Sequence, residues 1–178
     1  NGEMITEAVR GNGAILVNHE GKRFYNELET RDNVSAAILK QTDKNAFLFF
    51  DSDMQKSLKA TNNYIKQSYT VTGNSLDEIA AKMKVPAAAL KQTMTEYAAA
   101  VAAKNDKQFG RADLPRPLNK APFYAIIVTP AVHHCMGGIK IDTKTQVYGQ
   151  NGQIIPGLFA AGEVTGGVHG GNRLGGNA

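Results

Sequence analysis

The sequence predicts an α+β protein with two structural units: mixed helices and short strands first, then a strand-rich segment. In the front part, apolar residues recur at helical spacing behind capping residues. After residue 120, short β-like runs alternate with Gly, Pro and Asn turns. The stretch 104–121 holds two prolines and five Lys or Arg residues, which is typical of an exposed linker. We therefore expect one domain over residues 1–120 and another over residues 121–178.

The first predicted elements are a hairpin and a helix. The apolar run 14–17 leads through a turn-like segment, 18–22, into Arg23 and Phe24, which predicts a β-hairpin over residues 14–25. Thr30 precedes an apolar stripe at positions 34, 37, 38 and 39. A capping residue in front of such a stripe predicts a helix over about 32–41.

A buried strand and two further helices follow. Residues 45–50 contain too many consecutive apolar side chains for a surface element, so we expect a buried strand. Ser75 and Glu78 have the spacing of a capping box, which places a helix start at Ser75. Pro86 fits the first position of the next helix, whose apolar face is Leu90, Met94, Tyr97 and Val101. Behind the linker, strands are expected at 123–128, 138–141 and 158–161.

Composition excludes little and selects no partner. The chain has 20 Lys and Arg against 16 Asp and Glu, a net charge of +4, but the cations are spread along it. This pattern gives no reason to expect nucleic acid. Cys135 is the single cysteine, so an internal disulfide is impossible and a CxxC metal site is absent. We expect no metal. No apolar run reaches the roughly 20 residues of a membrane helix.

The glycine-rich segment 162–178 is the strongest local signal for a ligand. It contains seven glycines around Glu163, His169 and Arg173. Such density is expected where backbone approaches a ligand or adopts positive φ. The planar guanidinium of Arg173 suits bidentate binding of a carboxylate or phosphate. The segment matches neither G-x-G-x-x-G nor the P-loop spacing.

Other candidate residues remain open on local context alone. His133 and His134 are adjacent, so on a strand only one imidazole can face a given site. Taken alone, the pair indicates one surface histidine and one core histidine. His169 could contact a ligand or be exposed. The charges in the segment 6–10 and at Arg31 and Asp32 are, by composition, ordinary surface charges.

Taken together and in order, several motifs resemble the soluble fumarate reductase flavoproteins of the flavocytochrome c type. The matching segments are Thr6–Asn18, Gly21–Phe24, Thr30–Asp32, Ser35–Ile38, Thr129–His134, Met136–Gly138, Ile155–Leu158 and Gly162–Ala178. The likeness covers the chain from end to end. It implies that residues 1–120 form most of a capping domain and that residues 121–178 are an incomplete C-terminal portion of an α/β FAD-binding domain.

The resemblance also implies a reaction and its residues. FAD N5 would deliver hydride to one alkene carbon of fumarate, and Arg31 would donate a proton to the other, giving succinate. Glu7 and Arg10 would reprotonate Arg31. Substrate would be bound by Thr6, Glu7, His133 and Arg173. Flavin contacts would come from Glu163, Gly137, Gly138, Gly162, Gly175, Gly176, Asn177 and Ala178.

The resemblance leaves three interpretations of the function. The first is fumarate reduction. The second is reduction of another unsaturated acid, such as urocanate or an acrylate, or dehydrogenation of a ketosteroid. The third is a non-catalytic capping fragment. The chain starts at Asn1 and stops within the glycine-rich segment, so we expect a fragment that lacks the nucleotide-binding part and binds FAD weakly or not at all. No haem motif is present. The electron donor and the choice between bacterial periplasm and cytoplasm stay open.

Overall fold

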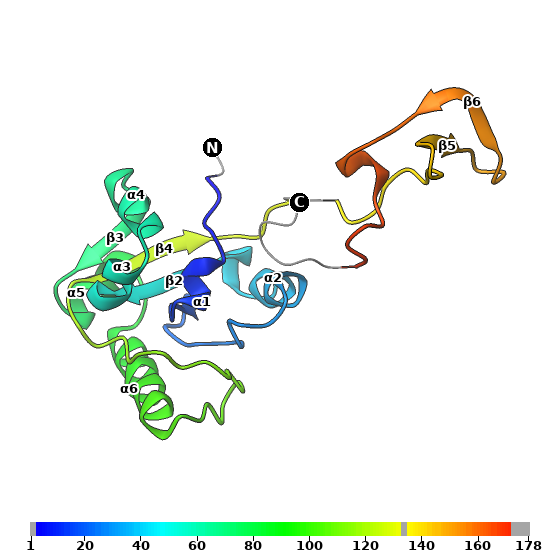
Figure 1. Cartoon of the computed structure of the whole chain (residues 1–178). Helices are drawn as coiled ribbons and strands as arrows, with labels where there is room; N and C mark the ends of the chain where they lie inside the picture. The colour runs from blue at the N-terminus through cyan, green and yellow to red at the C-terminus, as the bar shows by residue number, and fades with distance from the viewer. Residues whose placement is uncertain (1–2, 133–134, 172–178) are drawn as a thin grey trace. The chain divides into compact units, whose positions relative to one another are not determined.

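The structure is a computed structural model that describes residues 3–132 and 135–171. It divides into two compact units, one up to Pro130 and one from Ala131 (Figure 1). Each unit has its own secondary structure, and they are described separately below.

The first unit is built on a four-stranded antiparallel sheet. Its strands are β1 (Ile15–Val17), β2 (Ala46–Asp51), β3 (Thr70–Gly73) and β4 (Phe123–Val128), in the order β1-β2-β4-β3. Strands β2 and β4 therefore occupy the middle of the sheet, and Leu48 lies opposite Ile126 in their register. Every residue of β2 is buried, which confirms the predicted buried strand.

Helices surround this sheet (Figure 1). They are α1 (Ala8–Gly11), α2 (Arg31–Leu39), α3 (Ser52–Ser57), α4 (Ala60–Lys66), α5 (Leu76–Met83) and α6 (Ala87–Ala103), with a 3₁₀ turn η1 (Thr42–Lys44). The helix predicted at 32–41 is confirmed as α2. The Ser75 hydroxyl accepts a hydrogen bond from Glu78 N at 3.1 Å, so the predicted cap of α5 is confirmed. Helix α6 buries Leu90, Met94 and Tyr97 in the core and follows Pro86, which lies at its N-cap.

Two expectations for the first unit are wrong in detail. The hairpin over 14–25 is reduced to one bridge, between Val17 and Arg23, because β1 pairs along its length with β2. The stretch 104–121 is not an exposed linker, because Asp106, Arg111 and Leu118 are buried in it.

The division between the units also falls later than the composition indicated. Strand β4 pairs with both β2 and β3, so it belongs to the first unit, and the second unit starts at Ala131 rather than at residue 121.

The second unit contains a two-stranded antiparallel ribbon and a short helical turn. These are β5 (Gln146–Tyr148), β6 (Ile154–Phe159) and η2 (Glu163–Thr165). The strand expected at 138–141 is reduced to a bridge between Ile141 and Val147. Leu158 and Phe159 on β6 are 45% and 59% exposed, so this ribbon carries little core of its own.

The helices and strands found within the two units confirm the predicted α+β class. Within the residues that the structure describes, each helix is too short or too polar to cross a bilayer.

Candidate functional site

The first unit contains an ion pair between Arg31 and Glu7. Arg31 is the first residue of α2, and Glu7 is the N-cap residue of α1. Arg31 Nη2 donates to Glu7 Oε1 at 3.2 Å, and Arg31 Nε contacts Glu7 Oε2, so the guanidinium binds the carboxylate through two nitrogens. Their side chains are 33% and 39% exposed, so the pair is accessible to a ligand and to solvent. A bidentate pair fixes the direction of both groups.

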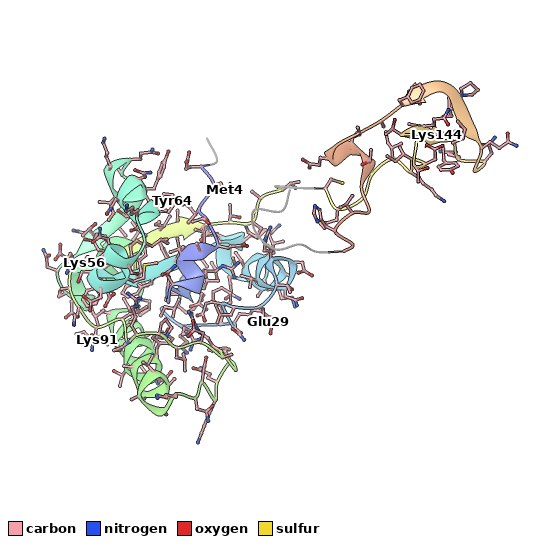
Figure 2. The ribbon with its side chains drawn as sticks, viewed as in Figure 1. Met4, Glu29, Lys56, Tyr64, Lys91 and Lys144 are labelled. Carbon is pink, nitrogen blue, oxygen red and sulfur yellow. The ribbon has the colours of Figure 1, made fainter. Side chains whose placement is uncertain are left out.

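Thr6 precedes this pair and is fixed through its backbone. Its N–H donates to the hydroxyl of Tyr64 at 3.1 Å, and its hydroxyl accepts from Ala8 N at 3.3 Å. Tyr64, labelled in Figure 2, comes from α4 and is buried. The start of α1 is thus attached to α4 by a contact that orients Thr6 and Glu7 together.

Arg10 lies one helical turn from Glu7. Residues three apart on a helix are neighbours on its surface, so the two side chains lie on the same side of α1. Arg10 Nη1 donates to the backbone oxygen of Glu27. Burial lowers the pKa of Arg10 below its ordinary value; Glu7 and Glu27 oppose that shift, whereas the positive charges of Arg111 and Arg31 add to it. The site therefore holds a partly desolvated arginine beside a carboxylate that already binds a second arginine.

Arg10 contacts a cluster of four buried charged residues, which we call the buried charge cluster: Arg23, Glu27, Asp106 and Arg111. Arg23 Nε and Nη2 donate to the two oxygens of Glu27 at 2.9 and 2.8 Å. Arg23 Nη2 also donates to Asp106 Oδ2 at 2.9 Å, and Arg111 Nη1 to Glu27 Oε2 at 3.2 Å. Two cations face two anions, which is the condition under which buried charges are tolerated.

The pKa shifts within this cluster follow its hydrogen bonds. Burial alone would lower the pKa of Arg23, but the hydrogen bonds to Glu27 and Asp106 outweigh it and raise that pKa. Burial would likewise raise the pKa of Asp106, and the hydrogen bond from Arg23 reverses the shift, so that the pKa is lowered. Both groups are thus held in their charged forms.

In the second unit, two glycine segments cross at a distance that only glycine allows. A Cβ on Gly138 would lie 2.4 Å from both Gly166 N and Val164 O. Ile139 N donates to Val164 O at 2.8 Å, and Gly167 N donates to Met136 O at 3.2 Å. The backbone of residues 136–139 therefore lies directly against η2 and the residues that follow it.

Glu163 begins η2 behind Gly162, which has a φ of +81°. Its Oε1 accepts a hydrogen bond from Cys135 N at 3.4 Å. A Cβ built on Gly137, Gly162, Gly167 or Gly170 would meet no atom within 4 Å. This part of the second unit thus presents open backbone without side chains to cover it.

The sequence-derived site residues fall into three groups. Thr6, Glu7, Arg10 and Arg31 are brought together in the first unit. Gly137, Gly138, Gly162 and Glu163 are brought together in the second. The remainder lie outside the described residues: His133, Arg173, Gly175, Gly176, Asn177 and Ala178.

Sequence reasoning missed the buried charge cluster. Asp106 and Arg111 come from the stretch interpreted as a linker, and Arg23 was noted only within a motif. No local signal separates a buried charge from an exposed one, because burial here depends on partners distant in sequence, such as Arg111 and Glu27.

Comparisons with known proteins agree on one family. The family model described as "FAD binding domain" matches residues 1–178. The chain is 55% identical over 177 residues to "Fumarate reductase (cytochrome)" of Shewanella frigidimarina, which covers 99% of this chain and 31% of the relative. It is 42% identical over 171 residues to "NADH:acrylate oxidoreductase" of Vibrio harveyi, covering 92% of this chain and 17% of that protein.

A solved structure gives the same result. The open conformation of a flavocytochrome c3 fumarate reductase superimposes with a TM-score of 0.84 at 45% identity, covering 98% of this chain and 31% of the other. The chain thus spans about a third, or less, of the length of these relatives. The match over all 178 residues places the chain in the FAD binding domain family, and within it the chain is similar to fumarate reductase flavoproteins of the flavocytochrome c type.

Proposed function

We propose that the chain forms part of an FAD-dependent reductase that converts fumarate to succinate, with Arg31 as the proton donor. The observation that carries the proposal is the accessible, bidentate Arg31–Glu7 pair beside the desolvated Arg10. A surface ion pair would not need a second, half-buried arginine next to its carboxylate. A proton donor that must be recharged from solvent needs such a chain of groups.

The described glycine segment fits the cofactor that the family implies. Backbone without side chains at Gly137, Gly162, Gly167 and Gly170 leaves room for a flat ring or a phosphate to approach closely. We propose that Glu163, Gly137, Gly138 and Gly162 contact the flavin, together with Gly175, Gly176, Asn177 and Ala178. Reduced FAD, when bound, would supply the hydride for one alkene carbon, its two electrons coming from a separate electron donor.

The proton path runs through three side chains of the first unit. An arginine normally keeps its proton, because its ordinary pKa is above about 12. Proton donation from Arg31 therefore requires rapid replacement, and Glu7 is the group in contact with its Nε and Nη2. The lowered pKa of Arg10 makes proton release toward Glu7 less costly than it would be in water. We propose the order Arg10, Glu7, Arg31.

Substrate binding in this proposal uses groups at both carboxylates. Thr6 lies in the hydrogen-bonded segment that also presents Glu7. We assign His133 and Arg173 to the substrate carboxylates, because a dicarboxylate held at both ends can be twisted toward the transition state by binding energy. A short dicarboxylate uses more cations than a monocarboxylate does.

A second candidate substrate is a monocarboxylate such as acrylate, favoured by the likeness to the Vibrio harveyi acrylate oxidoreductase. Turnover of the intact protein on fumarate, urocanate and acrylate separates the two. Fumarate should give the highest kcat/KM, and absence of fumarate turnover would overturn the first assignment. A third reading is a capping fragment without chemistry, and residues 1–178 purified without bound flavin would support it for this piece.

The role of Arg31 is tested by Arg31→Lys in the intact protein. We expect kcat to fall by about 10²–10⁴-fold, the typical contribution of a positioned acid, with fumarate affinity largely retained. Arg116→Lys is the matched control, because Arg116 Nη1 donates to the Asp53 backbone oxygen at 2.9 Å and belongs to no part of the proposed path. FAD content should be equal in both variants. Near-normal kcat in Arg31→Lys would show that another group is the acid.

A further inference from the structure

The buried charge cluster does more than balance its own charges, because one member also binds Arg10. Arg23, Glu27, Asp106 and Arg111 are 7%, 0%, 4% and 2% exposed. The two cations and two anions would satisfy one another without any contact to α1. The contact to Arg10 is therefore additional to what burial requires.

Arg111 makes this contact. Its Nη2 donates to the backbone oxygen of Arg10 at 2.9 Å, and its Nη1 donates to Ala14 O at 2.9 Å and to Glu27 Oε2 at 3.2 Å. Its Nε donates to Asp113 O at 2.8 Å, which fixes the plane of the guanidinium. One side chain thus connects the end of α1, the residue before β1, and Glu27.

Glu27 completes a closed arrangement. Its backbone oxygen accepts a hydrogen bond from Arg10 Nη1, while its carboxylate is held by Arg111. Arg10 is therefore bound at its backbone by Arg111 directly and at its guanidinium by a residue that Arg111 also binds. Displacement of Arg111 would remove the bond to the Arg10 backbone oxygen and one of the bonds that hold Glu27, the residue that binds the Arg10 guanidinium.

We propose that Arg111 is a positioning residue for the proton path: by binding the Arg10 backbone oxygen and the Glu27 carboxylate at once, it fixes the Arg10 guanidinium on the Glu7 side of α1. This inference rests on the proposed function for its effect on catalysis, but its structural part can be tested separately. Arg111 itself touches neither substrate nor cofactor in the proposal.

Arg23 provides a closely matched control. Both arginines are buried, both bind Glu27, and both stand over the Tyr97 ring, at 5.0 Å for Arg23 and 5.9 Å for Arg111. The hydrogen bonds of the Arg23 side chain, among the described residues, run to Glu27 and Asp106. Replacement of either arginine perturbs the cluster, whereas replacement of Arg111 alone removes a direct bond to Arg10.

The experiment compares Arg111→Lys with Arg23→Lys in the intact, FAD-loaded protein, by crystal structure and by kinetics. In Arg111→Lys we expect the Arg10 guanidinium to move by about 1 Å or more. We also expect kcat to fall at least about tenfold with little change in KM, and the solvent deuterium isotope effect on kcat to increase. In Arg23→Lys, Arg10 should keep its contact with Glu27 O and kcat should stay within about twofold, the change expected when no bond to Arg10 is lost. A purely structural role would lower Tm in both variants and leave the isotope effect unchanged.

The outcomes separate the two proposals. An unmoved Arg10 in Arg111→Lys overturns the positioning role, whatever the activity. A displaced Arg10 with unchanged kcat on fumarate also overturns it. If the wild-type protein reduces no unsaturated acid, the proposed function fails, and the displacement alone decides whether Arg111 holds Arg10. If Arg111→Lys fails to fold, Arg111→Gln is used instead. In that variant the two anions, Glu27 and Asp106, are still balanced by two cations, Arg23 and Arg10. The same displacement of Arg10 is expected.

Discussion

Glu27→Gln should destabilise the first unit strongly, although it changes one atom. Glu27 Oε1 accepts from Leu16 N at 3.3 Å and from Arg23 Nε at 2.9 Å, and Oε2 accepts from Arg23 Nη2 and Arg111 Nη1 at 2.8 and 3.2 Å. Either orientation of the glutamine amide turns its NH₂ group toward two donors. Two hydrogen bonds to the carboxylate are then lost, and at about 1.5–3 kcal/mol for each bond to a charged group the cost is about 3–6 kcal/mol.

The measurement is thermal unfolding of residues 1–178, followed by circular dichroism at 222 nm. All α-helices of the described residues belong to the first unit, so this signal reports on that unit. A loss of this size should lower Tm by roughly 10–20 °C. Glu78→Gln is the control, because Glu78 pairs with Lys82 at the same i, i+4 spacing but both side chains are exposed, 40% and 48%. Equal Tm values for the two variants would refute the argument from burial.

Three further predictions concern backbone space, acid stability and the cofactor. Gly73→Ala places a methyl group 2.6 Å from the backbone nitrogen of Ile79, so we expect about 1–3 kcal/mol of destabilisation by urea unfolding, whereas Gly11→Ala meets no atom within 4 Å and should not destabilise. The pKa of Asp106 is lowered in the folded chain, so its contribution to stability is present above an ordinary carboxyl pKa and is lost as pH falls through the lowered value. In Asp106→Asn, Tm should therefore fall less between about pH 4 and pH 2 than it does in the wild-type protein. Gly138→Ala forces apart two crossing backbones, so the intact protein should retain less FAD by absorbance, and unchanged FAD content would contradict this.

Local signals predicted the elements whose formation depends on neighbouring residues. The sequence predicted the Ser75 cap, the helix after Pro86 and a buried strand at 45–50, which the structure has at 46–51. Capping residues and apolar runs act over a few residues, so they can be recognised locally. The segment from α3 to β3 was not predicted, since helices of six or seven residues are too short to show a clear apolar periodicity.

Nonlocal interactions account for the main errors. The composition of residues 104–121 predicted an exposed stretch. Arg111 and Asp106 are nevertheless buried, because Arg111 binds Glu27 and Asp106 binds Arg23, both far away in sequence. For the candidate site, the resemblance supplied Glu7, Arg10 and Arg31, and the structure shows that the three lie together. The residues that hold Arg10 in place could not be named from the sequence, because their role depends on those same distant contacts.

The strand order has a consequence for how the chain acquires its fold. The last strand of the first unit, β4, lies between β2 and β3, so these two earlier strands have no shared partner until residues 123–128 have been synthesised. A ribosome-bound chain that has reached only residue 120 would expose one edge of β2 and leave β3 unpaired, and such edges readily pair with other chains. A piece ending at residue 120 should therefore aggregate on expression. A piece ending at Pro130 contains β4, the strand that joins β2 to β3, and should aggregate less.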